Sequence, residues 1–330
     1  MSQPATDVVV VGAGVVGLTT AVLLAERGSD VRVLAAEGPL ETTSAVASAM
    51  VGPNLFPEGE PAFEWEDRGR EVFTELAQDP ASGVTVRSGT LSARQEPPFP
   101  MTLDAGPIDV ADPSLLPDGF DWGFRTQTPL VDMVPYLRYL VARLETAGAR
   151  VEIRRLGSLD EATELAPAVM NCSGLGSREL TGLRLHPSRG QHVVVANPGI
   201  DEFFMEAPFG PSWAALWPHG DHVVLGATAT EDAVDDPRVR ARQTQEIIAR
   251  CARIDPRLAE ASVLGIQVGL RPQREDGVYL RAERRGDAVC VHNVGHAGSG
   301  VSQSWGTAET AVRLLDEARE PRPRSGAKDE

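Results

Sequence analysis

DVVVVGAGVVGLTTAVLLAE, residues 7–26, joins an unbroken apolar run to a glycine-rich turn and then to a segment rich in alanine and leucine. Four consecutive valines are typical of a parallel strand that is buried on both faces. The segment after the turn predicts a helix that ends at Gly28, and Val31–Leu34 predicts a second strand. The stretch therefore predicts a βαβ unit.

Three glycines in the turn fit the fingerprint of a dinucleotide site. Gly12 permits the tight turn, Gly14 lets the backbone approach a pyrophosphate, and Gly17 lets the helix pack against the strand. The N–H groups at the start of the helix, at Val15 and Val16, are expected to point at the phosphates. A purely structural turn is the alternative, but the complete βαβ context favours a dinucleotide.

An acidic residue is expected after the second strand, where it would bind the ribose hydroxyls. Glu37 is the candidate, because its distance from Gly17 fits the fingerprint. It stands beyond the expected end of the strand, so a solvated loop carboxylate is an equally open interpretation.

Size and charge exclude several classes of protein. The chain has 330 residues, 42% of them hydrophobic, which suits two interleaved domains better than one. Its formal net charge of −16 argues against nucleic acid and anionic membranes as partners. Cys172, Cys251 and Cys290 form no C-x-x-C pair, so neither a disulfide framework nor a metal site is predicted. The lack of a signal peptide or a membrane span makes the cytoplasm the expected compartment.

The remaining pattern predicts an antiparallel sheet interleaved with the first unit. Val51–Phe124 is rich in proline and predicts loops and short strands around one helix. Ala168–Gly176 predicts an apolar strand followed by a turn of small residues. The other predicted elements are helices at Trp65–Leu76, Val131–Ala147 and Arg240–Ile254, and strands at Val151–Arg154, His192–Ala196, Trp213–Trp217, His222–Gly226 and Val263–Leu270.

Six short blocks follow one another over nearly the whole chain. They are VVVGAGVVG at residues 9–17, Glu41–Ser44, Asn171–Gly174, Ser188–Gln191, Gly269–Pro272 and Asn293–Gly300. In order and spacing these blocks resemble the D-amino acid oxidase family. The arginine–proline block followed by the glycine–histidine block is the most selective part of this resemblance.

The resemblance implies an α/β fold in which a Rossmann-like FAD-binding domain is interleaved with an antiparallel-sheet α+β substrate domain. We expect residues 1–55, 125–185 and 275–317 to form the FAD-binding domain, 56–124 and 186–274 the substrate domain, and 318–330 a flexible tail. The implied reaction converts D-amino acids with neutral or bulky side chains to imino acids, and hence to 2-oxo acids and ammonia. FAD is held noncovalently, O2 is reduced to H2O2, and a homodimer is compatible with the family.

The resemblance also implies the site residues. Arg271 corresponds to the arginine that binds the substrate carboxylate, and Gly298 to a backbone group beside substrate and flavin; a surface arginine before a proline is the alternative interpretation of Arg271. A guanidinium suits the first role because it forms two parallel charge-assisted hydrogen bonds with a carboxylate. The residues implied to bind FAD are Gly12, Gly14, Val15, Val16, Gly17, Glu37, Thr43, Ser44, Ala49, Met50, Leu156, Ser173, Gly174, Arg271, Gly298, Ser299, Gly300, Val301 and Ser302.

The chain departs from the family at two positions that usually carry aromatic residues, where it has Ala215 and Ser299. Either the pocket is open to larger or different amines, or other side chains replace the lost contacts. The candidates for replacement are Trp213, Trp217, His219 and Gln267. An oxidase of glycine, sarcosine or a specialised biosynthetic amine, and a flavin-binding relative without turnover, therefore stay open as alternative functions.

Overall fold

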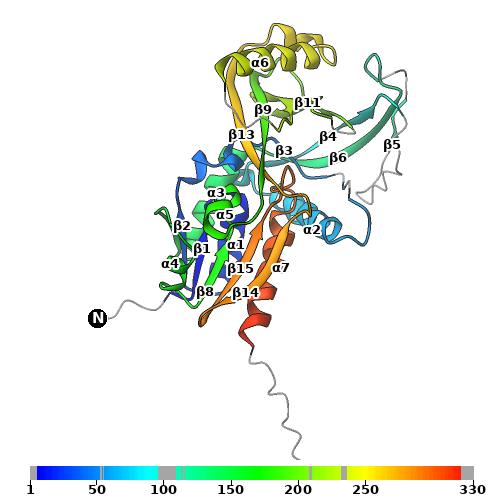
Figure 1. Cartoon of the computed structure of the whole chain (residues 1–330). Coiled ribbons are helices and arrows are strands. Elements are labelled where there is room, and N and C mark those ends of the chain that lie inside the picture. Colours follow the sequence, from blue (N-terminus) through cyan, green and yellow to red (C-terminus); the bar gives the residue numbers. More distant parts are fainter. Residues whose placement is uncertain are drawn as a thin grey trace, which may run out of the picture.

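The computed structural model describes residues 6–52, 54, 56–95, 109–112, 114, 116–207, 210–231 and 236–320. These residues form two β-sheets, one in the lower and one in the upper half of Figure 1, with helices packed on both. The prolines between residues 97 and 113, which mark the predicted loop region, lie outside the described residues.

The lower sheet has six strands in the order β14-β15-β8-β1-β2-β7 and is parallel except for the β14–β15 pair. Helix α1 (Val15–Glu26) connects β1 to β2, so the predicted βαβ unit is confirmed. The strands are β1 (Val8–Val11), β2 (Val31–Ala35), β7 (Arg150–Ile153), β8 (Ala168–Asn171), β14 (Tyr279–Arg285) and β15 (Ala288–Val294).

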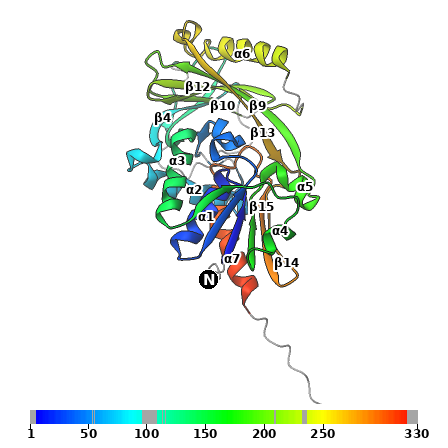
Figure 2. The ribbon, with the colours of Figure 1, turned by 90° about the vertical axis from the view of Figure 1, so that its left-hand side faces the viewer.

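Helices cover both faces of this sheet, so β1 is buried on both sides as the run of valines predicts. Val8 and Val10 belong to the core that includes α1, whereas Val9 and Val11 belong to a second core on the opposite face. Figure 2 shows α1 and α3 on one side of the sheet and α4 and α5 on the other. The remaining helices of this half are α3 (Met133–Thr146), α4 (Asp160–Thr163), α5 (Ser177–Thr181), α7 (Ser304–Arg319) and the short 3-10 turns η1 (Pro39–Glu41), η2 (Thr43–Val46), η3 (Pro80–Ser82) and η5 (Gly174–Gly176).

The upper sheet has nine strands in the order β13-β9-β12-β11-β10-β4-β6-β3, with β5 paired to β6. It is antiparallel except for the β4–β10 pair, so the predicted second sheet is confirmed. Helix α6 (Pro237–Cys251), followed by the turn η6 (Pro256–Ala259), packs Ile247 and Cys251 against this sheet. The strands are β3 (Ala49–Met50), β4 (Val84–Ala93), β5 (Asp109–Val110), β6 (Trp122–Val131), β9 (His186–Ala196), β10 (Phe203–Glu206), β11 (Ser212–His219), β12 (His222–Thr228) and β13 (Val263–Gln273).

Helix α2 (Pro61–Leu76) packs closely against α7. A Cβ atom on Gly69 would collide with the carbonyl oxygen of Ser302, and one on Gly306 would collide with the backbone of Trp65. The indole Nε1 of Trp65 also donates a hydrogen bond to Thr310 Oγ1 (3.1 Å). The predicted domain boundaries place α2 and α7 in different domains, and that division stays a prediction.

Two features differ from the pattern that the sequence predicts. β4 and β6 are ten residues each and pair along their full lengths, where only short strands are expected. Gly89 in β4 and Pro129 in β6 interrupt the alternation of apolar and polar residues that would have identified long strands. The pairing of the two strands with each other stabilises them instead. α7 continues to Arg319, whose guanidinium donates to the carbonyl oxygen of Asp7, so the helix extends into the expected tail; residues 321–330 lie outside the described residues.

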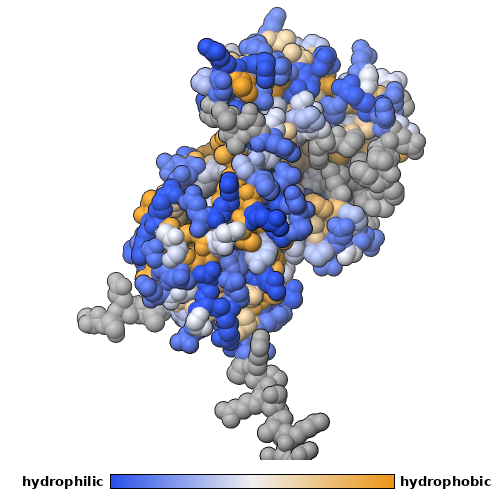
Figure 3. All heavy atoms as spheres, viewed as in Figure 1, coloured by the Kyte–Doolittle hydropathy of each residue, from blue (hydrophilic) through white to orange (hydrophobic). Residues whose placement is uncertain are grey.

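Hydrophilic residues cover most of the face in Figure 3, in keeping with the net charge of −16. The three cysteines are buried and form no disulfide, as the sequence predicts. Within the described ranges, no helix combines the length and the hydropathy that crossing a membrane requires.

Candidate active site

A cavity of about 1510 Å³ lies where the carboxyl ends of β1, β2 and β8 meet strands β9, β11 and β13 of the upper sheet. Ligands of open α/β sheets bind at this end of the strands. The volume exceeds the roughly 300–1,000 Å³ of a pocket for a drug-sized ligand. The cavity is therefore large enough for a dinucleotide together with a small substrate.

Nearly all of the predicted site residues line this cavity. Gly17 and Ala49 are the two that do not. Which of the lining residues contacts FAD, and how, stays a prediction. The lining residues from the predicted set are Gly12, Gly14, Val15, Val16, Glu37, Thr43, Ser44, Met50, Leu156, Ser173, Gly174, Arg271, Gly298, Ser299, Gly300, Val301 and Ser302.

The glycine turn is packed too closely for side chains. Gly12 has a φ of +110°, and a Cβ atom there would lie 2.5 Å from the carbonyl oxygen of Cys172. A Cβ atom on Gly17 would collide with the carbonyl oxygen of Gly12, so Gly17 supports the turn from the helix side. Gly14 lines the cavity, and a Cβ atom there would lie 3.1 Å from Ser44 Oγ.

The helix start is only partly free for an anion. The N–H group of Val15 already donates to the hydroxyl of Ser44 (3.0 Å), so this N–H group is satisfied from within the chain. Thr43 Oγ1 donates to the carbonyl oxygen of Leu270 (3.2 Å) on β13. The segment around η2 therefore joins the glycine turn to the strand that carries Arg271.

Two features fit the predicted FAD. The helix starts at a turn of glycines, which lack side chains, and the cavity has a suitable volume. A second group of backbone donors lies in the loop before α7. Within the described part of the chain, the N–H groups of Gly298, Gly300 and Val301 make no hydrogen bond. Backbone donors of this kind can stabilise negative charge on a reduced flavin ring.

Arg271, on β13, lines the cavity together with Arg154, Arg155, Arg189 and Arg240. Its Nη1 donates to the carbonyl oxygen of Thr228 (3.0 Å), and within the described ranges it forms no ion pair with a carboxylate. Burial lowers the pKa of its guanidinium, although an arginine remains charged. The Cδ atom of Arg271 lies 3.8 Å from the Cβ position of Gly298, so the two predicted catalytic groups are neighbours.

His192 lines the same region but was not identified from the sequence as a site residue. Its Nδ1 lies 3.3 Å from Ser48 Oγ, and its ring meets that of Trp217 edge to face, with centroids 5.6 Å apart. Burial, together with the charge of Arg271, lowers the pKa of His192 to about 4. The imidazole is therefore neutral at physiological pH. An isolated histidine in a strand carries no sequence signal that it lines a cavity.

Two tryptophans of β11, rather than tyrosines, line the cavity. Trp213 and Trp217 are at the cavity, whereas His219 and Gln267 are not among the residues that line it. Ala215 lies fully buried between the tryptophans on β11. A Cβ atom on Gly226 would collide with the Trp217 ring and would lie 3.4 Å from that of Ala215, so small residues at both positions make room for the indole.

Known proteins of similar sequence cover nearly the whole chain. The family described as FAD dependent oxidoreductase matches residues 7–314. A D-amino-acid oxidase from Rubrobacter xylanophilus is 41% identical over 317 residues, covering 94% of this chain and 96% of the relative, and one from Streptomyces coelicolor is 39% identical, covering 93% and 96%. The crystal structure of glycine oxidase from Geobacillus kaustophilus superposes with a TM-score of 0.79 over 97% of this chain and 96% of that chain, at 21% identity, and so supports the fold. The chain therefore belongs to the FAD-dependent oxidoreductase family, and its cofactor is FAD.

Proposed function

We propose that this protein oxidises D-amino acids to imino acids, which hydrolyse to 2-oxo acids and ammonia, while O2 is reduced to H2O2. The observation that carries the proposal is Arg271, a partly buried cation that lines the cavity with no carboxylate partner among the described residues. The two bacterial relatives named as D-amino-acid oxidases support the choice of enantiomer.

Arg271 binds the α-carboxylate of the substrate in this proposal. A guanidinium can form two parallel hydrogen bonds with a carboxylate, and these fix the orientation of the α-carbon as well as its position. Because desolvation disfavours the lone cation, pairing with a carboxylate is more favourable here than at an exposed arginine. The substrate is thereby oriented before the chemical step, for which its ammonium group must first lose a proton to water, because the nitrogen lone pair forms the C=N bond.

The chain supplies orientation rather than a proton acceptor. Bound FAD supplies the hydride acceptor for the Cα–H bond. His192 and His296 both line the cavity with pKa values lowered to about 4, so each is a weak proton acceptor near neutral pH. Orienting the substrate Cα–H bond toward the flavin accounts for the catalysis of hydride transfer without a general acid or base.

Neutral and bulky side chains fit an apolar part of the cavity wall. Trp213, Trp217 and Met205 line it with aromatic and thioether surface. Apolar surface of this kind favours an apolar side chain through the hydrophobic effect. The absent tyrosines are therefore replaced, in this proposal, by indole contacts.

The test mixes the purified holoprotein anaerobically with matched D- and L-amino acids and monitors the flavin absorbance. H2O2 release is then measured in air. We expect D-methionine, D-phenylalanine and D-alanine to bleach the flavin and their L-enantiomers to leave it oxidised. Arg271→Ala should raise KM by roughly ten- to a hundredfold, because a charged hydrogen-bond pair is lost. Arg271→Lys is the matched control for charge and should recover only part of that loss.

Other outcomes of the same panel would favour the alternatives. Reduction by glycine or sarcosine alone would indicate an oxidase of small or N-methylated amines. A flavin that no amine reduces would indicate a binding protein without turnover. A homodimer and a cytoplasmic location stay predictions.

A further inference from the structure

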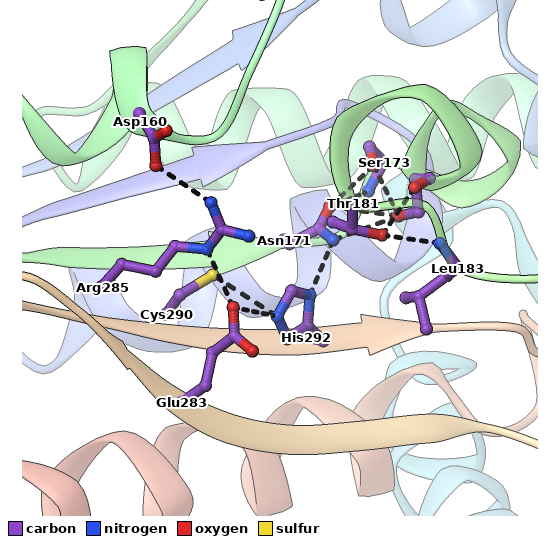
Figure 4. Close-up of polar contacts among 10 residues, drawn as sticks. Asp160, Asn171, Ser173, Thr181, Leu183, Glu283, Arg285, Cys290 and His292 are labelled. Atoms are coloured by element: carbon purple, nitrogen blue, oxygen red, sulfur yellow. Dashed lines mark hydrogen bonds and ion pairs between the residues drawn. The ribbon is translucent and has the colours of Figure 1, made fainter.

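A chain of polar contacts extends from the surface of the lower sheet to the cavity, across β14, β15 and β8 (Figure 4). Glu283 Oε1 lies 3.2 Å from His292 Nε2, and His292 Nδ1 lies 3.0 Å from Asn171 Nδ2. Ser173 Oγ donates to Asn171 Oδ1 at 2.6 Å. Of these four residues, only Ser173 lines the cavity.

The hydrogen bonds fix one tautomer of His292. Asn171 Oδ1 accepts from the hydroxyl and the backbone N–H of Ser173, so its Nδ2 amide group faces the imidazole. His292 Nδ1 must then accept, and Nε2 carries the proton and donates to Glu283. The orientation of the Asn171 amide and the tautomer of the neutral ring are therefore coupled.

The surroundings of His292 make its protonation matter. Asn171 is 0% and His292 2% exposed, so an unsatisfied donor in either is costly. Facing the ring are Glu283 and Arg285 from β14, Cys290 from its own strand, and the ring of Tyr279 at 5.5 Å; Arg285 also bonds Asp160 of α4. Burial lowers the pKa of His292 despite the carboxylate of Glu283.

Hydrogen bonding accounts for this cluster without a metal ion. Glu283, Cys290 and His292 bring their potential ligand atoms within 4.8 Å of one another. However, Arg285 already binds Glu283 at 2.8 Å, and burial raises the pKa of the Cys290 thiol to about 12. The carboxylate of Glu283 is therefore already paired within the chain, with Arg285 and with His292.

We propose that Glu283, His292 and Asn171 are positioning residues that fix the Ser173–Gly174 turn for FAD, and that protonation of His292 weakens FAD binding. A proton on Nδ1 would place two donors opposite each other. A reversal of the Asn171 amide, whose Nδ2 also donates to Ser177 Oγ (3.1 Å), removes the conflict. That reversal withdraws Oδ1 from both Ser173 groups. The protonation state of His292, which lies outside the cavity, thereby affects the residues that bind the cofactor.

The test measures the dissociation constant of FAD from the apoprotein by flavin fluorescence between pH 8 and 5, with the thermal midpoint of the apoprotein recorded alongside. His292→Phe removes both hydrogen bonds and should weaken FAD binding about tenfold at pH 8. His292→Asn is the matched variant: its amide oxygen can still accept from Asn171 but cannot titrate. It should bind FAD as the parent does at pH 8 and lose less affinity than the parent on acidification.

A double-mutant cycle separates positioning from general destabilisation. Ser173→Ala removes the cavity-lining hydroxyl, and the Ser173→Ala, His292→Phe double variant should bind FAD no more weakly than the weaker single variant. Glu283→Gln, at a partly exposed position, provides a second variant if His292→Phe does not fold. Because Glu283 raises the pKa of His292, this variant should move the loss of FAD affinity on acidification to lower pH.

Equal FAD affinity in His292→Phe and the parent, or strictly additive effects in the cycle, would overturn the proposal. Because no substrate is present in these measurements, they are independent of which amine is oxidised.

Discussion

The guanidinium group of Arg271 lies against the backbone of Gly190, at the place where any other residue would carry its Cβ atom. Gly190 stands on β9 opposite Gly269 of β13, in the same ladder in which Arg271 pairs with Ser188. The absence of a side chain at Gly190 thus decides where the cation rests. Two of the predictions below follow from close contacts of this kind.

Gly190→Ala should push the Arg271 guanidinium out of its place and raise KM for the amino acid by at least about tenfold, since overpacking costs roughly 1–3 kcal/mol. FAD affinity should change little, because the glycine turn is untouched. Steady-state kinetics and FAD titration measure both effects. Gly265→Ala, on the neighbouring β13 strand with no atom within 4 Å of the new Cβ, is the control. Similar kinetics in the two variants would contradict the idea.

Gly12→Ala should abolish tight FAD binding. The new Cβ would lie 2.5 Å from the Cys172 carbonyl oxygen, and a φ of +110° disfavours any side chain. Gly28→Ala shares the positive φ (+91°) but meets open space, so it should cost roughly 1–2 kcal/mol of stability through the left-handed backbone and leave FAD affinity as it is. Flavin content after purification and a titration of the apoprotein distinguish them. Retained yellow colour in Gly12→Ala would show that the turn does not need glycine.

Trp217→Ala should reduce the preference for D-phenylalanine over D-alanine by roughly ten- to a hundredfold in kcat/KM, because apolar contact worth about 1–3 kcal/mol is lost. The ring lines the cavity and is 4% exposed. Trp122→Ala, which removes a 36% exposed indole from β6, is the matched control and should leave the ratio alone. An unchanged ratio in Trp217→Ala would remove this residue from the substrate wall.

Acid should destabilise the protein through its buried histidines. The pKa of His296 is lowered by burial to about 4, whereas an unfolded histidine titrates near 6.5, so the unfolded chain binds the proton more readily. Stability contributed by the neutral ring is therefore lost as the pH falls from about 6.5 to about 4, at up to roughly 1.4 kcal/mol per pH unit. His296→Gln should make the pH dependence of denaturant unfolding shallower over this window.

The control for that experiment is His186→Gln, because His186 is exposed on β9. Its slope should match the parent, since the side chain meets water in both states. If His296→Gln and the parent lose stability in parallel between pH 6.5 and 4, the buried ring is not the group responsible.

The sequence predicts best those elements of the fold that form because of interactions between residues close together in the chain. The four valines of β1, the glycines of the turn and the helix after them each satisfy a short-range requirement of burial or backbone conformation. β4 and β6 were expected to be only short strands because their stability comes from pairing with each other, which no single segment reveals. The same limit applies to α2, whose packing on α7 depends on Gly69 and Gly306 together.

By itself, the sequence determined the βαβ unit and the two-sheet class, because periodicity and glycine placement are read along the chain. The segments that line the cavity were implied by the resemblance of short sequence blocks to a known family. Only the tertiary structure decided which side chains act together. Arg271 finds its place through Gly190, Trp217 through Gly226, and Asn171 meets His292 from 121 residues away. Such pairs are set by strand order and close packing, and these depend on the whole chain folding at once.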